Sequence, residues 1–233
     1  MTPALALFVK TPGLSPVKTR LAATLGVPQA TQFYRLSAAA TMAVARRCQK
    51  ALIPYWAVAE ADADASLAWS GAAHVWQGEG ALGARLHKVY AELRARHGRV
   101  LLIGADAPQL TPALLIDALT ALDAAPFVCG DAADGGFWLF GGREPIVSSA
   151  WLGVRYSQAD TAAQLRHALA SHGHVAGAPT LADVDTAKVL PELVRTLAAL
   201  SEPLAEQRAL LRWLQATLQP VRSQSAPHLP MRQ

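Results

Sequence analysis

The sequence predicts one α/β domain with a doubly wound, mostly parallel sheet and helices on both of its faces. Short apolar runs recur along the chain, they do not alternate with polar residues, and segments of helical periodicity separate them. Continuous apolar runs are typical of strands buried on both faces, as in a parallel sheet. Strands that alternate with helices are typical of doubly wound folds.

The expected strands are the apolar runs at residues 4–9, 52–59, 72–76, 100–103 and 127–129. A further strand is expected at residues 137–140, after two adjacent glycines, and an antiparallel orientation is considered for it. Helical periodicity predicts helices at residues 29–50, 81–97, 112–122 and 158–172. Pro112 follows Thr111, and proline directly after an N-cap residue is typical of a helix start.

Two more helices are expected near the C-terminus. Four apolar residues recur there at offsets of three and four and form one stripe: Leu190, Leu193, Val194 and Leu197. A last amphipathic helix is expected at residues 203–218. Residues 219–233 have little to bury and are expected to form a disordered tail. Because no repeat or linker interrupts the pattern, we expect a single domain over residues 1–218.

The composition narrows the classes of partner. Of the 233 residues, 52% are hydrophobic and 16% are charged, which is typical of a globular protein with one large core. The net charge of +4 is scattered rather than gathered among aromatics, so we expect an anionic small molecule rather than a nucleic acid. The chain shows no signal-peptide pattern and no apolar run long enough for a membrane span, which predicts a cytoplasmic protein.

Residues for covalent or histidine–metal chemistry do not stand out. Cys48 and Cys129 are widely separated in apolar or helical stretches, which predicts buried, reduced thiols. His172 and His174 have no third ligand nearby in the sequence, and no G-x-S-x-G motif is present. The search for a site therefore turns to the loops that follow the strands, where doubly wound sheets bind ligands.

The loop after the first strand, residues 10–21, contains Gly13 and then Lys18, Thr19 and Arg20 at an expected helix start. Backbone N–H groups at such a start, a lysine and a forked guanidinium together form a plausible binding site for a diphosphate. The loop lacks the spacing of a Walker A motif. The alternative is a solvated basic turn.

Gly104 and Asp106 directly follow the strand at residues 100–103. A carboxylate at the end of a buried strand can bind a hard cation such as Mg²⁺ or Mn²⁺. Such a cation would neutralise charge on a diphosphate leaving group. The alternative is that Asp106 caps the turn that follows it.

Asp134, Gly135 and Gly136 follow the strand at residues 127–129. The glycines allow close approach to a ligand, which predicts a sugar or acceptor pocket, with Asp134 orienting a hydroxyl or acting near the metal. A plain Asp-Gly hairpin turn is the alternative. Later, Asp183 and Asp185 alternate before a helix, where Asp185 is a second candidate metal ligand or an N-cap.

Residues 78–83 match the dinucleotide motif G-x-G-x-x-G, with Asp106 about 20 residues further on. A nicotinamide enzyme is therefore a rival hypothesis. It is the weaker one, because the motif begins in the middle of the sheet and leaves Lys18 and Arg20 without a role.

Five segments occur in an order that carries a family resemblance: residues 12–21, 77–85, 104–108, 134–137 and 183–186. With them, the chain resembles a bacterial family of glycosyltransferase-A-fold proteins, described as glycosyltransferase-like or nucleotide-diphospho-sugar transferases. The resemblance covers about residues 4–190. It departs from the family pattern at residues 187–189, directly after the last segment.

The resemblance implies the glycosyltransferase-A fold and a metal-dependent transferase that uses a nucleotide-activated donor. It implies that Lys18 and Arg20 lie near the diphosphate, that Arg85 contacts the ligand, and that Asp106 is the carboxylate beside the metal. Asp106 and Asp134 are then the catalytic candidates, with Asp134 positioning the sugar or the acceptor hydroxyl or acting as base.

The expected partners are a nucleotide sugar and an unknown acceptor, with Mg²⁺ or Mn²⁺ as cofactor. One alternative is a nucleotidyltransferase that joins a nucleoside triphosphate to a phosphorylated small molecule and releases pyrophosphate. A second alternative is a non-catalytic nucleotide-binding protein.

Overall fold

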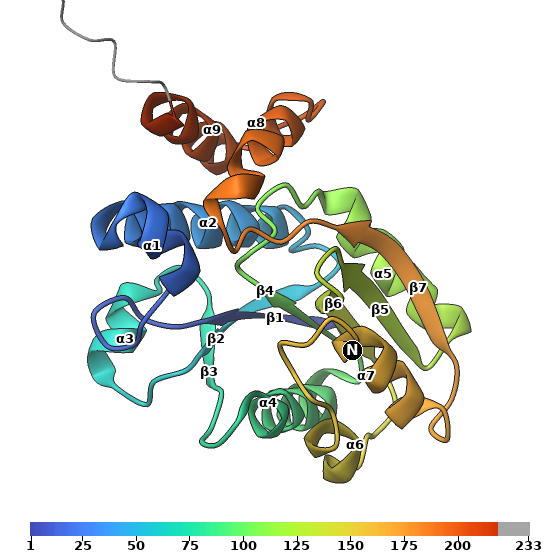
Figure 1. The fold of residues 1–233 in the computed structure, drawn as a ribbon. Helices are drawn as coiled ribbons and strands as arrows, with labels where there is room; N and C mark the ends of the chain where they lie inside the picture. The colour runs from blue at the N-terminus through green and yellow to red at the C-terminus, as the bar shows by residue number, and fades with distance from the viewer. Residues whose placement is uncertain (219–233) are drawn as a thin grey trace, which may run out of the picture.

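The computed structural model describes residues 1–218, so the tail predicted at residues 219–233 lies outside the described residues. Seven strands form one sheet in the order β3-β2-β1-β4-β6-β5-β7, with helices on both faces (Figure 1). The strands are β1 (Ala4–Val9), β2 (Ile53–Val58), β3 (Ala73–Trp76), β4 (Val100–Gly104), β5 (Phe127–Ala132), β6 (Phe137–Gly142) and β7 (Val175–Leu181). The predicted fold class is confirmed.

The helices are α1 (Thr19–Leu25), α2 (Val27–Arg47), α3 (Ala63–Ala68), α4 (Leu82–His97), α5 (Pro112–Ala124), α6 (Ser148–Leu152), α7 (Thr161–Leu169), α8 (Leu190–Ala198) and α9 (Ala205–Leu218). A short 3₁₀ helix, Ala187–Val189, precedes α8. The long helices lie where the periodicity predicts them. The sequence analysis did not assign α3 and α6, because helices of five or six residues are too short to show a period. No helix within residues 1–218 is both long and apolar enough to cross a bilayer.

All strands of the sheet run parallel except β6, which pairs antiparallel with both β4 and β5. This confirms the antiparallel orientation considered for residues 137–140. The sequence analysis did not predict β7, which pairs with β5 at the edge of the sheet. Its sequence contains Gly177 and Pro179 and is only partly buried, because an edge strand needs neither a full ladder of hydrogen bonds nor two apolar faces.

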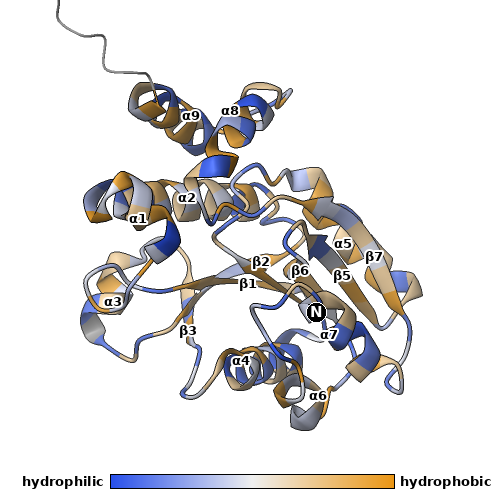
Figure 2. Ribbon diagram, in the orientation of Figure 1, coloured by the Kyte–Doolittle hydropathy of each residue, from blue (hydrophilic) through white to orange (hydrophobic). Residues whose placement is uncertain are grey.

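The two faces of the sheet contribute to separate cores. Along β1, Leu5 and Leu7 point into the core beneath α2 and α5, whereas Ala4 and Ala6 point into the core above α4, α6 and α7. All four are fully buried, and Figure 2 shows β1 as hydrophobic along its length. Each buried leucine contributes about 1.5–3 kcal/mol to stability.

A third apolar cluster lies outside the sheet, where α8 and α9 pack on α1 and α2 (Figure 1). Phe33 of α2 and Leu210 of α9 are fully buried in it. This cluster anchors α1 and the chain that leads from β7 to α8, and both segments carry candidate site residues. Cys48 and Cys129 are buried and free, as predicted.

Candidate functional site

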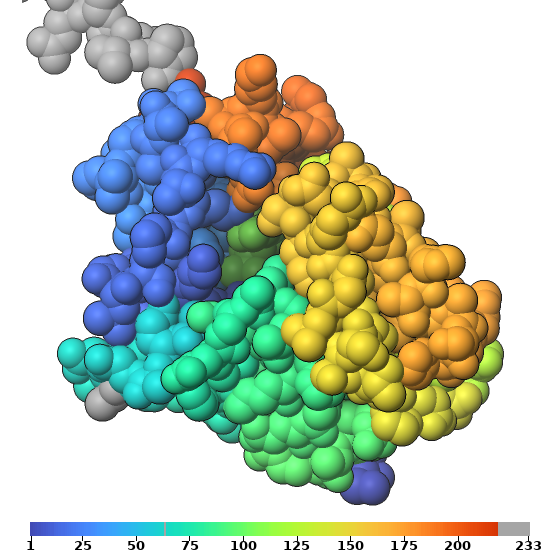
Figure 3. Space-filling model, turned by 60° about the horizontal axis from the view of Figure 1, so that its bottom comes forward, coloured from blue at the N-terminus to red at the C-terminus, as the bar shows by residue number. Residues whose placement is uncertain are grey.

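The loops that follow the parallel strands meet at one edge of the sheet, because the strands share one direction. Backbone hydrogen bonds join these loops: Val184 N donates to Asp106 O at 3.1 Å, and Ala133 N donates to Leu181 O at 3.1 Å. Figure 3 shows a hollow on this side, between the N-terminal segment (blue), α4 (teal to green) and the α6–α7 region (yellow). Most of the residues that the sequence analysis selects from different loops thus line one cleft.

Lys18 lies at the centre of this cleft as the residue that precedes α1. Its Nζ lies 2.9 Å from Asp106 Oδ1 and 3.0 Å from Asp185 Oδ1, and it also donates to the carbonyl oxygen of Val184. Its side chain is only 4% exposed. Burial by itself lowers the pKa of Lys18, but the two carboxylates outweigh burial, and the net shift is upward. The residue is therefore a buried ammonium whose three N–H donors all have acceptors.

The backbone of Lys18 is left-handed, with φ at 46°. Ser157, with φ at 59°, is the other non-glycine residue with positive φ among residues 1–218, and it lines the same cleft. Such conformations cost energy and gather at functional sites. The sequence analysis missed Ser157, because nothing in a sequence marks a serine that adopts this conformation.

The other residues of the first loop are more open to solvent. Arg20 lies at the rim, 66% exposed, with Nη1 3.4 Å from Asp185 Oδ2. Thr19 is the first residue of α1, and Thr19 and Arg20 both line the cleft next to Lys18. Gly13 turns the loop with φ at 101° but does not line the cleft.

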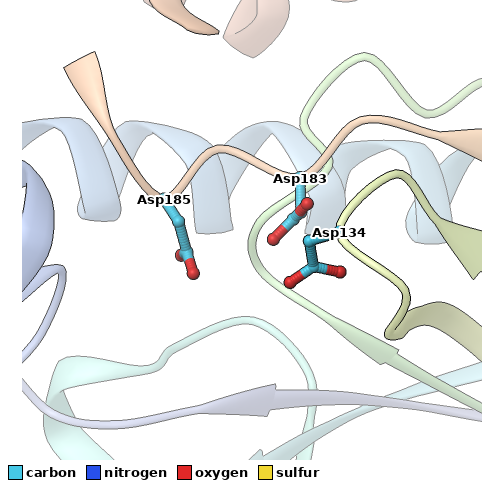
Figure 4. A group of neighbouring side chains, drawn as sticks. All are labelled: Asp134, Asp183 and Asp185. Carbon is cyan, nitrogen blue, oxygen red and sulfur yellow. The ribbon is translucent and has the colours of Figure 1, made fainter. Parts of the chain in front are cut away.

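Asp134, Asp183 and Asp185 form a group of carboxylates, with one oxygen from each within 4.8 Å of the others (Figure 4). Burial raises the pKa of the Asp183 carboxyl, and the carboxylates of Asp134 and Asp185 raise it further. The sequence analysis pairs Asp106 with Asp185 as metal ligands. In the structure Asp185 lies with Asp134 and Asp183 and also shares Lys18 with Asp106, so the predicted pairing of Asp106 with Asp185 stays a prediction. The only sequence signal for Asp183 is its place in the late motif.

This donor set fits a divalent cation. Magnesium and manganese prefer carboxylate oxygens, and three of them converge here from two separate loops. The pKa of Asp183 is raised mainly by burial and further by the carboxylates of Asp134 and Asp185, and a bound cation would offset that repulsion. Lys18 neutralises part of the negative charge of this group through its ion pair with Asp185.

The cleft consists of two compartments that share Phe8, Leu82, Gly104, Asp106 and Ser157. The polar compartment, about 530 Å³, lies over the first loop and is lined by Lys18, Thr19, Arg20 and Asp185. The apolar compartment, about 220 Å³, is lined by aromatic and aliphatic side chains together with Asp134, Gly136 and Asp183. The carboxylates therefore lie at the junction of a polar and an apolar cavity.

The glycine-rich segment after β3 has a structural explanation. At Gly83, α4 packs so closely against α6 that only glycine fits. A Cβ at this position would lie 2.6 Å from the carbonyl oxygen of Trp151. Arg85 donates from Nε to Gly80 O at 2.9 Å and lines neither compartment, so its predicted ligand contact stays a prediction. Gln77, which the site prediction omits, donates to the carbonyl oxygens of Val9 and Ala57 and joins the ends of β1 and β2.

The turn at Asp134 depends on glycine. Asp134 Oδ1 accepts a hydrogen bond from Gly136 N at 2.8 Å. Gly135 has φ at 90°, and a Cβ there would lie 1.9 Å from the carbonyl oxygen of Ala159. The turn and the segment before α7 are thus in direct backbone contact.

We expect Gly135→Ala to lower the free energy of unfolding by about 1–3 kcal/mol, because it combines left-handed strain with a backbone clash. Urea denaturation measures this loss. The matched control is Gly177→Ala, since a Cβ at Gly177 meets nothing within 4 Å. Equal stability of the two variants would contradict the packing described for this turn.

Comparisons with known proteins agree with this architecture. A protein-family model described as "Uncharacterized protein conserved in bacteria (DUF2064)" matches residues 39–158. A crystal structure from Desulfovibrio desulfuricans, provisionally described as a nucleotide-diphospho-sugar transferase, is 26% identical with a TM-score of 0.82. It covers 93% of this chain and 97% of that chain. The search of curated proteins found no match.

Two more distant structures share the fold alone. The 4-diphosphocytidyl-2C-methyl-D-erythritol synthase from Anaerococcus prevotii is 10% identical, with a TM-score of 0.55 and coverage of 92% of this chain and 98% of that chain. A manganese complex of Rv0371c from Mycobacterium tuberculosis is 18% identical, with a TM-score of 0.52 and coverage of 86% and 100%. The predicted nucleotide-diphospho-sugar transferase-like fold is confirmed.

Proposed function

Starting from the fact that this chain belongs to the DUF2064 family, we propose that it is a metal-dependent transferase that moves a sugar from a nucleotide diphosphate sugar to an acceptor hydroxyl. The resemblance to the Desulfovibrio desulfuricans protein over nearly the whole chain supports the class of donor.

The observation that carries the proposal is the junction of the two compartments. Asp134, Asp183 and Asp185 gather there beside a buried lysine, with a basic rim on one side and an apolar cavity on the other. A site that holds a cation between two unlike cavities suits a reaction between an anionic donor and a chemically different acceptor.

In this proposal the diphosphate of the donor lies in the polar compartment. Arg20, exposed at the rim, donates to its oxygens, and Lys18 adds a fixed positive charge while it holds Asp106 and Asp185 in position. The sugar lies at the junction, where Gly104 and Ser157 line both compartments. Gly136 leaves room for the acceptor in the apolar compartment.

The reaction breaks the bond between the sugar C1 and the diphosphate oxygen and forms a bond from C1 to the acceptor oxygen. The acceptor proton passes to a carboxylate, for which Asp134 is the candidate because Oδ2 does not take part in the hydrogen bond of its turn. The nucleoside diphosphate leaves with the bonding electrons. Asp134, Asp183 and Asp185 would hold Mg²⁺ or Mn²⁺, which supplies positive charge to that leaving group.

A nucleotidyltransferase is the second candidate, because the Anaerococcus prevotii synthase has the same fold. It would release pyrophosphate from a nucleoside triphosphate rather than a nucleoside diphosphate from a sugar donor. A non-catalytic nucleotide-binding protein is the third candidate and would bind without turnover.

A thermal-shift screen tests the three candidates. Nucleoside diphosphate sugars, nucleoside triphosphates and nicotinamide dinucleotides are each added with and without Mn²⁺ or Mg²⁺, since a ligand that binds the native state raises the melting temperature. We expect metal-dependent stabilisation by one nucleotide sugar. Stabilisation by a triphosphate alone would select the nucleotidyltransferase, and a response only to dinucleotides would overturn both transferase hypotheses. Incubation with the stabilising sugar donor and assay of released nucleoside diphosphate then separate turnover from binding.

A further inference from the structure

The apolar compartment offers a ligand very few polar contacts. Several of its lining side chains carry a polar atom, but most of these atoms are already engaged within the protein. Trp138 Nε1 donates to Pro179 O at 2.9 Å, and Tyr156 Oη donates to Trp151 O at 3.1 Å. Thr161 Oγ1 shares its hydrogen between the backbone carbonyl oxygens of Arg155 and Gln158, in the segment before α7. The aromatic rings therefore present their carbon faces to the cavity.

The polar side-chain groups left for a ligand are the carboxylates and the hydroxyl of Ser157. Asp106, Asp134 and Asp183 line the compartment, and no lysine or arginine is among the described residues that do so. An anionic group in this cavity would face these carboxylates, because Lys18 is already shared between Asp106 and Asp185 and, in the proposed reaction, the metal at Asp134, Asp183 and Asp185 faces the donor diphosphate. A hydroxyl is different, because it can donate to a carboxylate and needs no counter-charge.

Size and wall chemistry restrict the rest of the ligand. The compartment measures about 220 Å³, which is smaller than the roughly 300–1,000 Å³ of sites for drug-sized molecules. Phe8, Leu86 and Phe137 form much of its wall. A polyol would leave several hydroxyls unpaired against these side chains, and each unpaired buried polar group costs free energy.

We propose that the apolar compartment selects the acceptor, and that this acceptor is an uncharged alcohol with an apolar face rather than a phosphorylated, carboxylated or polyhydroxylated molecule. The proposal rests on the proposed function for the role of acceptor, but the selectivity of the cavity follows from its own walls. It also separates the two transferase hypotheses, because a nucleotidyltransferase that acts on a phosphorylated molecule needs a lysine or arginine for the acceptor phosphate, and none is among the described residues that line this cavity.

The test is a ligand-detected NMR titration with benzyl alcohol, benzyl phosphate and glucose as probes. Protein saturated with Mn²⁺ and the best nucleoside diphosphate is used, so that the metal is already coordinated. We expect benzyl alcohol to bind at least about tenfold more tightly than either other probe. The free energy lost by placing like charges together, or by leaving hydroxyls unpaired, is larger than the free energy to which a tenfold ratio of affinities corresponds. Equal or tighter binding of benzyl phosphate or glucose would overturn the proposal.

Two variants locate the binding. Phe137→Ala removes part of the wall and is expected to weaken the binding of benzyl alcohol several-fold. Unchanged affinity for benzyl alcohol in the folded variant would overturn the assignment of its binding to this cavity. Leu82→Arg adds the missing cation at the mouth, where Leu82 is 44% exposed, and is expected to raise the affinity for benzyl phosphate. Leu152→Arg is the matched control, because Leu152 is 59% exposed and lines neither compartment. An equal gain in both arginine variants would show unspecific attraction and contradict the proposal.

The same titration in metal-free buffer without nucleotide keeps the two claims apart. If no nucleotide binds the protein, the proposed function fails. The probes then still report on the cavity, since its walls do not depend on the donor. Loss of the preference for benzyl alcohol in both buffers overturns the selectivity itself.

Discussion

Replacing Lys18 by alanine is expected to lower the free energy of unfolding by about 2 kcal/mol in metal-free buffer. The change removes the buried ammonium that lies between Asp106 and Asp185 and leaves these carboxylates facing each other. Removal of one partner from a buried ion pair costs about 3–5 kcal/mol, and solvent reduces that figure here because the carboxylates are 43% and 40% exposed. Urea denaturation with a two-state fit measures the difference.

Arg20→Ala is the matched control, because Arg20 also pairs with Asp185 but its side chain is 66% exposed. An exposed pair contributes about 0–1 kcal/mol, so the control is expected to keep nearly full stability. The stabilising effect of Lys18 should persist at neutral pH, since the pKa of Lys18 is raised and its charge is lost only as the pH rises through that value. Equal losses in the two variants would show that burial of Lys18 contributes nothing.

The second large effect concerns the metal. We expect Asp183→Asn to weaken Mn²⁺ binding by about tenfold or more, because the Asp183 carboxylate is one of three that converge within 4.8 Å. Asp185→Asn should weaken it at least as much, since Asp185 belongs to the same group and also holds Lys18. The electron paramagnetic resonance signal of free Mn²⁺, followed during titration of the protein, measures both affinities without nucleotide or turnover.

Asp106→Asn decides between the ligand set predicted from the sequence and the set that the structure brings together. Asp106 faces Lys18 and is not part of the three-carboxylate group, so we expect a much smaller loss of Mn²⁺ affinity than for Asp183→Asn. A larger loss for Asp106→Asn would restore the pairing of Asp106 with Asp185. Melting temperatures of all three variants show whether a loss of affinity merely reflects unfolding.

The sequence alone determined the fold class and the positions of most elements. Runs such as residues 4–9 and 100–103 are continuous and apolar because both faces of their strands are buried, and burial of this kind is a property of the local sequence. The edge strand β7 escaped prediction because it is only partly buried and contains Gly177 and Pro179, so no continuous apolar run marks it. The choice of the loops after the strands also needed no structure, because parallel strands end at one edge of the sheet.

The tertiary structure decided which of these loop residues face each other. Lys18 and Asp185 are separated by 167 positions, and no local pattern relates them. They meet because β1 lies next to β4, the central strand of the sheet, and the chain after β7 crosses back to the end of β4, where Val184 N donates to Asp106 O. Asp183 joins Asp134 in the same way, through the hydrogen bond between the chain around Leu181 and the turn after β5. The sequence thus provided the carboxylates and the lysine, but strand order and the hydrogen bonds between loops determine whether a given carboxylate faces the lysine or the other acids.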